Sequence, residues 1–314
     1  MNRMMKRPIF FLYFASMSLA GFAQPMMLKS KSADIVVKSN GKPTKLVVKP
    51  KGEQHEIFEA KMHLPVALQP NLISSVNTIG KSFLGTPYVY FTLDSNHRAK
   101  TRLKPMSKEV LVVNLKQLDC VTFVENTVAL AQTRLDKNNS FENYKKKLQE
   151  IRYRKGVVDY AARHHYFTDW MFEQAQKGLL KDITQDLGGE PYQKTVTIMT
   201  YKKDTAYGNM ADPKTFETIR QVEDAINKRP HFYIPEAKIP ALENKLLDGD
   251  IVAITTHEKR IEIAHVGFIV KRNGRAHLMH ASSVKKQVVI TEEPMADYLM
   301  KNKGQSGVMI ARLQ

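Results

Sequence analysis

The chain has 314 residues, of which 43% are hydrophobic and 25% are charged. This composition supplies ample apolar material for a folded core and excludes a wholly disordered chain. The formal net charge of +17 favours polyanionic partners. An anionic cell envelope fits that charge, and so does a purely solubilising role for the lysines. Because the sequence has neither zinc-finger spacing nor an aromatic RNA-binding signature, no nucleic acid partner is expected.

Residues 1–23 are typical of a secretory signal peptide. Three basic residues in MNRMMKR precede the apolar stretch PIFFLYFASMSLAGFA, which ends in small residues. This stretch is short for a spanning helix, although an uncleaved anchor is the alternative, and no later segment has the long apolar run of a membrane span. The mature protein is therefore predicted to be exported to the periplasm as a soluble monomer, without stable membrane insertion.

Residues 24–56 are rich in lysine and contain no aromatic residue. Two β-branched runs flank Asn40-Gly41, a favourable turn pair. The segment is predicted to be either a small hairpin or a flexible arm, and a catalytic domain is predicted to span 57–314.

The globular part begins with helical patterns and ends with strand patterns. Helical spacing is found in 71–85, with Asn71 as a cap, and in 141–153 and 213–229, while EVLVVNL (109–115) looks like a buried strand. Short β-branched runs then follow in 249–256, 262–270, 275–282 and 286–291, a pattern typical of an antiparallel meander. This order predicts an α+β domain with helices packed on one side of an antiparallel sheet.

Cys120 is the only cysteine in the chain. It opens the segment 120–135, whose apolar positions fit one face of a helix. A lone thiol in an exported protein is open to oxidation and cannot form an internal disulfide, so its presence indicates a specific role. Since a helix N-terminus favours a negative sulfur, Cys120 is a candidate nucleophile. The alternative is a small apolar core residue.

Two histidines on successive predicted strands are the candidate partners of the thiol. His265 lies among apolar residues, where an imidazole is costly to bury without a task or a partner, and Gly267 leaves space on the same face. His280 on the next strand could hold the His265 ring in one tautomer. His277 competes for that role, because strand alternation cannot separate the two without a fixed register. Each histidine could instead be an ordinary structural residue.

Metal binding is a competing use of these residue types. The pairs His164-His165 and His257-Glu258 lack the His-Glu-x-x-His spacing, and one cysteine with scattered histidines makes no closed zinc site. The segment GQSG lacks the Gly-x-Ser-x-Gly elbow of serine hydrolases. No metal and no organic cofactor are expected.

The segment ARHHYFTDWM (162–171) contains the only tryptophan. One interpretation makes it a wall of the substrate cleft, where Arg163 or His165, beside Tyr166, meets a carboxylate or a sugar oxygen. The other makes it the start of a helix capped by Asp169, with its large apolar side chains in the core. Both interpretations can hold for different residues.

Five motifs occur in a fixed order: FLGTPYVY, LDCVTFVE, DGDIVAI, HVGFIV and MHAS. Together they resemble the NlpC-type superfamily of papain-like cysteine peptidases, which cut bacterial cell-wall peptides. NLKQLDCVTFVENTVALA, HHYFTDWM, YIPEAKI and HLMHASSVKKQVVI further resemble one branch, the exported N-acetylmuramoyl-L-alanine amidase-like proteins of Bacteroidetes. The resemblance covers roughly Phe58 to the C-terminus.

The resemblance implies a papain-like α+β fold and a peptidoglycan or muropeptide substrate. It implies that Cys120 attacks the amide carbonyl, that His265 acts as base and then as acid, and that His280 orients His265. Tyr88 would lie beside the sulfur and contact substrate or the developing oxyanion. Asp119 would order the helix start or the substrate.

One departure from the superfamily pattern bears on the scissile bond. Ser-Gly-Phe commonly follows Asp-Cys, whereas Val121-Thr122-Phe123 stands here. By resemblance, residues at this place help to read the free amine of an L-alanyl-γ-D-glutamyl stem, so the departure favours an amidase acting on the N-acetylmuramoyl-L-alanine bond. The family is associated with anhydro-muropeptides. A γ-D-glutamyl-diamino acid endopeptidase and a non-catalytic envelope-binding protein remain the alternatives.

Overall fold

The computed structural model describes residues 34–39, 42–47, 52–64, 71–93 and 108–314, so the predicted signal peptide lies outside the described residues. The chain divides into two compact units, Met1–Lys51 and Gly52–Gln314. In the first unit, strand β1 (Asp34–Ser39) pairs antiparallel with β2 (Lys42–Val47). The lysine-rich segment therefore contains an antiparallel strand pair.

The second unit holds the remaining elements. Its α-helices are α1 (Glu53–Met62), α2 (Leu72–Lys81), α3 (Cys120–Leu135), α4 (Phe141–Arg152), α5 (Phe167–Gln176), α6 (Ile198–Tyr201), α7 (Pro213–Lys228) and α8 (Met295–Met300). Its 3₁₀ helices are η1 (Arg154–Gly156), η2 (Gly208–Ala211) and η3 (Glu236–Lys245). Its strands are β3 (Leu180–Asp182), β4 (Glu190–Pro191), β5 (Phe232–Pro235), β6 (Ile251–Thr256), β7 (Ile263–Arg272), β8 (Arg275–Ser282), β9 (Gln287–Ile290) and β10 (Gln305–Leu313). Within the described ranges, no helix has the length and apolar character needed to cross a membrane.

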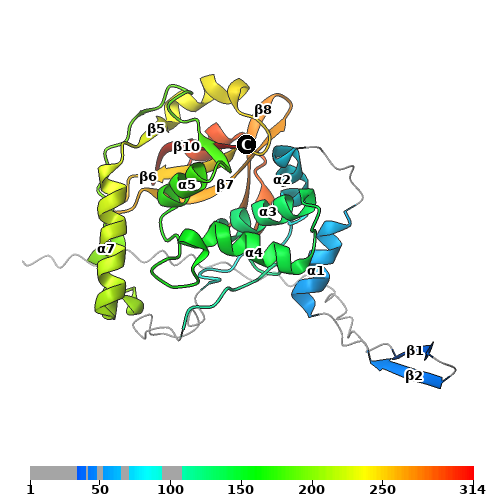
Figure 1. Ribbon diagram of the computed structural model, residues 1–314. Coiled ribbons are helices and arrows are strands. Elements are labelled where there is room, and N and C mark those ends of the chain that lie inside the picture. Colours follow the sequence, from blue (N-terminus) through cyan, green and yellow to red (C-terminus); the bar gives the residue numbers. More distant parts are fainter. Residues whose placement is uncertain (1–33, 40–41, 48–51, 65–70, 94–107) are drawn as a thin grey trace, which may run out of the picture. The chain divides into compact units, whose positions relative to one another are not determined.

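The strands of this unit form one sheet in the order β4-β5-β10-β6-β7-β8-β9, with β3 paired to β10. All of these pairings are antiparallel, and β6 to β9 form the expected meander. Helix α3 packs against β7 and β8, whereas α8 packs against β8 and η3 (Figure 1). The α+β prediction is confirmed, but helices cover both faces of the sheet and not one side alone.

The two faces of the sheet contribute to separate apolar clusters. Phe268 and Met279 pack with the apolar residues of α3 in one cluster. Ile269 and Leu278 point the other way and pack with Met295 of α8 in another. This alternation fixes which face each side chain of β7 and β8 occupies.

Helix α3 spans Cys120–Leu135 as predicted, but it is more deeply buried than a one-faced amphipathic helix. Glu125 and Asn126 are each only 1% exposed. Arg152 of α4 donates its Nε–H to Glu125 at 2.7 Å, and the Asn126 amide donates to the Thr122 carbonyl at 2.7 Å. These partners compensate the polar groups, so the helix can lie at the centre of the unit.

The predicted strand at 109–115 is wrong, since no strand is assigned to these residues. Its backbone is instead bound by side chains: the Arg152 guanidinium donates to the Val112 carbonyl at 2.6 Å, and the Leu115 N–H donates to the Gln54 side chain at 2.6 Å. Val110 is 61% exposed, so the apolar run is not uniformly buried. The predicted helices at α2, α4 and α7 are confirmed, and Asn71 caps α2.

Candidate active site

The N-terminus of α3 is fixed by a capping box. Asp119 Oδ1 accepts from the Thr122 N–H at 2.8 Å, and the Thr122 hydroxyl oxygen accepts from the Asp119 N–H at 3.0 Å. The other carboxylate oxygen of Asp119 accepts from the Thr92 hydroxyl at 2.9 Å. Asp119 therefore orders the helix start, as expected. Thr122, which departs from the superfamily pattern, belongs to this cap and is only 3% exposed.

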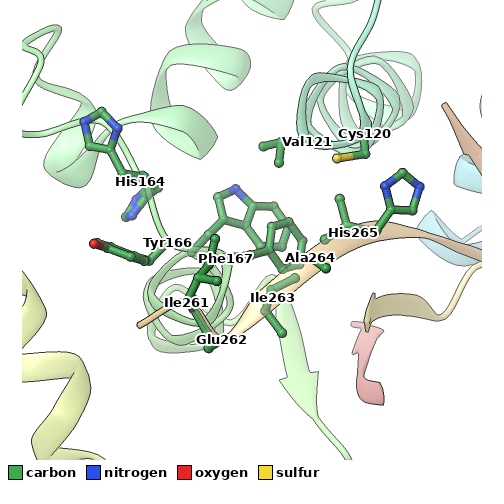
Figure 2. Close-up of a pocket in the computed structure, with 13 residues that line it drawn as sticks. Cys120, Val121, His164, Tyr166, Phe167, Ile261, Glu262, Ile263, Ala264 and His265 are labelled. Carbon is green, nitrogen blue, oxygen red and sulfur yellow. The ribbon is translucent and has the colours of Figure 1, made fainter. Parts of the chain in front are cut away.

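Cys120 opens onto a cavity of ≈ 80 Å³. Figure 2 shows the cysteine at the start of α3, with His265 beside it on β7 and Val121 over the hollow. The cavity is lined by Cys120, Val121, 164–167, Trp170 and 261–266. The predicted residues His165, Tyr166 and His265 thus share one cavity with the only thiol.

The two predicted catalytic histidines are in direct contact. His265 Nε2 lies 2.6 Å from His280 Nδ1, and the rings meet edge to face with centroids 4.8 Å apart. One of these two nitrogens carries the shared hydrogen. If the hydrogen is on His265 Nε2, the Nδ1 lone pair of that ring is left free to accept a proton.

The strand register separates His280 from its competitor His277. Val270 is paired with His277, and Phe268 with Met279. Because directly paired residues share a face and successive residues alternate, His280 falls on the face of His265 and His277 on the opposite one. His277 Nδ1 is 2.9 Å from the Thr291 carbonyl oxygen, so it has a local partner of its own.

Gly267 makes room for the histidine pair. A Cβ at this position would lie 3.0 Å from the His280 Cβ, 2.9 Å from Leu278 Cδ1 and 2.6 Å from the Met279 carbonyl oxygen. Any side chain here would push β8 away. The absence of a side chain lets the imidazole of His280 lie close to β7.

Enclosure by the protein keeps the thiol and both imidazoles uncharged. Burial raises the pKa of Cys120 to about 12, with a further contribution from Asp119, although backbone N–H groups of Val266 and its own helix turn oppose the shift. Burial lowers the pKa of His265 to about 4. It also lowers that of His280 to about 3, with His265 adding to the effect. The structure therefore holds a neutral thiol and neutral imidazoles.

A neutral Cys120 differs from a cysteine nucleophile that is already ionised before the substrate binds. Among the described residues, no hydrogen bond joins the Cys120 sulfur to His265. Proton transfer from sulfur to imidazole would create both charges together, and their attraction would offset part of the desolvation cost.

Of the predicted substrate-binding residues, Tyr88 lies near the Cys120 sulfur, whereas Arg163 lies outside the cavity lining. Tyr88 bridges to Leu118 in the approach to the cysteine. Burial raises the pKa of Tyr88, and a negative charge on Cys120 or Asp119 nearby would raise it further. Arg163 is 5% exposed, lies outside the set of residues lining the cavity, and pairs with Glu109 at 3.3 Å. Tyr88 is therefore close to the sulfur, whereas the guanidinium of Arg163 belongs to a buried ion pair.

The segment 162–171 combines a cavity wall with core residues. His165 Nε2 donates to the Tyr160 carbonyl oxygen at 2.7 Å, and burial lowers its pKa well below the usual range. Tyr166 donates its hydroxyl to Glu223. The expectation that Asp169 caps the helix is wrong, because α5 has no side-chain cap. The Asp169 carboxylate instead binds Arg154, Arg229 and His164.

Glu262 and Trp170 are lining residues that the sequence did not assign to the site. Glu262 is 2% exposed and accepts from the hydroxyl of Thr168 at 3.0 Å, although the two residues are 94 positions apart. Trp170 is 1% exposed and stacks on Phe167 with ring centroids 4.8 Å apart. The position of Glu262 beside His265 in the sequence was the only available signal.

The fold and the cavity define an α+β protein with a thiol and paired imidazoles gathered at one end of a central helix. The sequence model of the N-acetylmuramoyl-L-alanine amidase-like (AmiA-like) family matches residues 78–308. The chain belongs to this family. A search of curated proteins finds no significant match.

Solved structures agree with the family. An N-acetylmuramoyl-L-alanine amidase from Bacteroides uniformis ATCC 8492 is 28% identical with a TM-score of 0.69, over 77% of this chain and 99% of that chain. A Bacteroides fragilis protein provisionally named a xylanase is also 28% identical, with a TM-score of 0.66 over 74% of this chain and 99% of that one. A Legionella pneumophila protein, at 20% identity and a TM-score of 0.54 over 83% and 93% of the two chains, shares the fold.

Proposed function

We propose that this protein is an exported cysteine amidase that hydrolyses the amide between N-acetylmuramic acid and L-alanine in peptidoglycan fragments, including anhydro-muropeptides. The observation that carries the proposal is the shared cavity of Cys120 and His265, with His280 bonded to Nε2 of His265. Membership of the amidase-like family supports the substrate class. A central helix that begins at the thiol, followed by a sheet that carries the histidines, supports an NlpC-type papain-like fold.

Acylation starts from the neutral pair. His265 accepts the thiol proton on Nδ1 as the Cys120 sulfur attacks the amide carbonyl. The backbone N–H groups at positions 120 and 121 belong to the first turn of α3, where helix geometry leaves them without intrahelical acceptors. They are therefore donors for the oxyanion that develops on the carbonyl. The imidazolium then protonates the leaving amine of L-alanine, and a muramoyl thioester remains on Cys120.

Deacylation reuses the same groups. His265 removes a proton from an attacking water, and the sulfur leaves as the carboxylic acid forms. The imidazolium returns its proton to the sulfur, which restores the neutral pair. His280 acts by holding His265 through the 2.6 Å contact between their nitrogens, which fixes the ring orientation and the tautomer. Tyr88 lies at the entrance to the sulfur and contacts substrate. His165 and Tyr166 form part of the cavity wall on which the substrate would lie.

The scissile bond is tested by product analysis. The mature protein is incubated with purified muropeptides that contain L-alanine, D-glutamate and a diamino acid, and the products are identified by mass. We expect a free stem peptide that begins with L-alanine, together with the intact muramic sugar. Release of the diamino acid part, with L-alanyl-γ-D-glutamate still attached to the muramic sugar, would instead identify the endopeptidase, which uses the same catalytic residues.

A matched pair of variants separates catalysis from binding. Cys120→Ala should bind muropeptides and leave them intact, whereas the wild type should turn them over. Wild-type protein that binds cell wall and turns over no fragment would support the envelope-binding alternative. Turnover by Cys120→Ala at the wild-type rate would contradict the nucleophile assignment.

A further inference from the structure

Three residues that line the cavity each carry a buried side-chain nitrogen or oxygen atom without a hydrogen-bond partner. Across the described residues, seven buried side-chain nitrogen or oxygen atoms lack a partner, and three of them belong to cavity-lining residues: His164 Nε2, Trp170 Nε1 and Glu262 Oε2. These side chains are 7%, 1% and 2% exposed, respectively. An unpaired buried polar atom costs roughly 1–3 kcal/mol. The presence of three such atoms on residues of one cavity indicates that a ligand pairs with them.

Each of the three side chains is held in place by the first turns of α5. Asp169 binds His164 Nδ1 at 3.1 Å, which turns the other ring nitrogen away from the helix. The hydroxyl of Thr168 holds one oxygen of Glu262 at 3.0 Å and leaves the second oxygen unpaired. Phe167 stacks on the indole of Trp170 with an angle of 17° between the rings. The unpaired atoms are therefore positioned by neighbours that do not compete for them.

The chemistry of these atoms defines what can bind them. The indole Nε1–H of Trp170 only donates. Burial raises the pKa of the Glu262 carboxyl, and its unpaired oxygen is an acceptor when the group is ionised. His164 Nε2 is an acceptor in the neutral ring, because the carboxylate of Asp169 requires the hydrogen on Nδ1. Asp169 stays ionised: burial alone would raise its pKa, but His164 and Arg154 outweigh that effect and hold it below the usual range.

We propose that the wall formed by Trp170, Glu262 and His164 is a specificity-determining subsite that binds a secondary amide of the substrate. The amide carbonyl accepts from the indole N–H of Trp170, and the amide N–H donates to Glu262. His164 accepts from a neighbouring N–H or O–H of the same ligand. Asp169 and Thr168 are positioning residues. This inference rests on the proposed amidase function for the identity of the substrate.

Two parts of a muropeptide carry this chemistry. One is the acetamido group on the sugar, and the other is the amide that joins L-alanine to the next residue of the stem. Both offer one carbonyl and one N–H, so the geometry of the wall alone does not choose between them. Analogues that lose one of these groups at a time distinguish the two sources.

The single tryptophan of the chain provides a direct probe of the subsite. Trp170 is the only tryptophan, so the intrinsic emission of the protein reports on this wall. N-acetylmuramoyl-L-alanyl-D-isoglutamine is titrated into the full-length Cys120→Ala protein, which holds ligand without cleaving it. We expect saturable quenching or a spectral shift. An unchanged emission spectrum, with binding detected by calorimetry, would overturn the subsite.

Two analogues then identify the amide. One has a free amine in place of the sugar acetamido group, and the other carries an N-methyl group on the alanyl–isoglutaminyl amide. In the Cys120→Ala background, the analogue that lacks the recognised amide should bind about tenfold more weakly. Adding Glu262→Gln should abolish that difference between analogue and parent. Equal affinity of both analogues and the parent would overturn the proposal.

Kinetics with matched variants separate recognition from a merely structural role. In otherwise wild-type protein, Glu262→Gln and Trp170→Phe should each lower kcat/KM about tenfold, mainly through KM. Glu173→Gln is the control, because Glu173 lies on the same helix but outside the cavity lining. A variant that loses the same factor in kcat/KM on the parent muropeptide and on both analogues would indicate a structural role. So would a loss of kcat/KM that occurs only in a variant that is partly unfolded.

Failure of the subsite and failure of the proposed function give different results. If wild-type protein cleaves no muropeptide yet Trp170 emission still responds with the expected analogue dependence, the subsite stands and the amidase activity fails. If the protein cleaves the muramoyl amide while neither analogue nor variant changes affinity, the activity stands and the subsite fails.

Discussion

Two of the three histidines that line the cavity have different kinds of partner. His265 is bonded to a second imidazole, that of His280, at 2.6 Å. His164 is bonded to the carboxylate of Asp169, which also pairs with Arg154 and Arg229. One ring therefore has a partner that can be neutral, and the other has a partner that is charged.

This difference assigns different tasks to the two rings. A ring that stays neutral, and whose partner leaves one nitrogen free, can accept a proton from a thiol. A ring whose tautomer is fixed by a carboxylate, inside a network of ion pairs, is better suited to hold a ligand in one orientation. The predictions below test that division of labour, from the largest effect to the smallest.

Removing each imidazole should have very different consequences. We expect His265→Ala to lower kcat by about 10⁴-fold, because the general base and acid are lost. His164→Ala should lower kcat/KM by about 10- to 100-fold, chiefly through KM. Steady-state kinetics on one muropeptide with both variants make the comparison. Equal losses in kcat for the two variants would remove the distinction between them.

Substitution of His280, the partner of His265, should lower kcat, whereas substitution of His277 on the other face of the sheet should not. We expect His280→Ala to lower kcat about 10²-fold, since the ring of His265 loses its orientation. His277→Ala is the matched control on the same strand and should stay within about twofold of wild-type kcat. His280→Asn, which can still bind the ring nitrogen, should recover part of the rate. A larger loss of kcat for His277→Ala would contradict the register argument.

The acid limb of activity should lie unusually low. Since burial lowers the pKa of His265 to about 4, the base stays neutral above that pH, and kcat/KM should fall only as the pH drops through about 4. The free energy of unfolding should also fall at acid pH. An unfolded histidine has a pKa of about 6.5, so the unfolded state binds more protons below that pH, and acid therefore favours unfolding. A pH–rate profile and urea unfolding at several pH values measure both. An acid limb near pH 6.5 would contradict the neutral pair.

The cap of α3 should have the smallest effect. We expect Asp119→Ala to lower the free energy of unfolding by about 1–2 kcal/mol, because the Thr122 N–H loses its acceptor. Thermal unfolding should then shift down by a few degrees. Asp119→Asn keeps a capping oxygen and should retain most of the stability. If Asp119→Ala abolished activity without lowering the melting temperature, Asp119 would contact substrate rather than only order the helix.

The thiol and its imidazole pair could be predicted from the sequence because local patterns carried them. Cys120 opens a helical pattern, and His265 and His280 lie in strand patterns that the structure confirms. Strand alternation alone could not choose between His277 and His280, because a shift of one residue in register moves every side chain to the other face. The resemblance of the MHAS segment to the amidase-like proteins selected His280.

The cavity wall that contains Glu262 could not be predicted, because contacts between residues far apart in the sequence position it. Glu262 is positioned by Thr168, 94 residues earlier, and Asp169 binds arginines from two other segments instead of capping its helix. The same holds for the run 109–115, which looked like a strand although its carbonyls and N–H groups bind side chains of Arg152 and Gln54. A sequence pattern shows which groups need partners, and the fold decides which partners they find.

Trapping the acyl-enzyme tests the central claim most directly. The wild-type protein is quenched with acid during turnover of N-acetylmuramoyl-L-alanyl-D-isoglutamine, and the intact protein and its peptides are analysed by mass. We predict an added N-acetylmuramoyl group on the peptide that contains Cys120, and none in Cys120→Ala. An N-acetylmuramoyl-L-alanyl group on Cys120, or turnover by Cys120→Ala at the wild-type rate, would contradict the account.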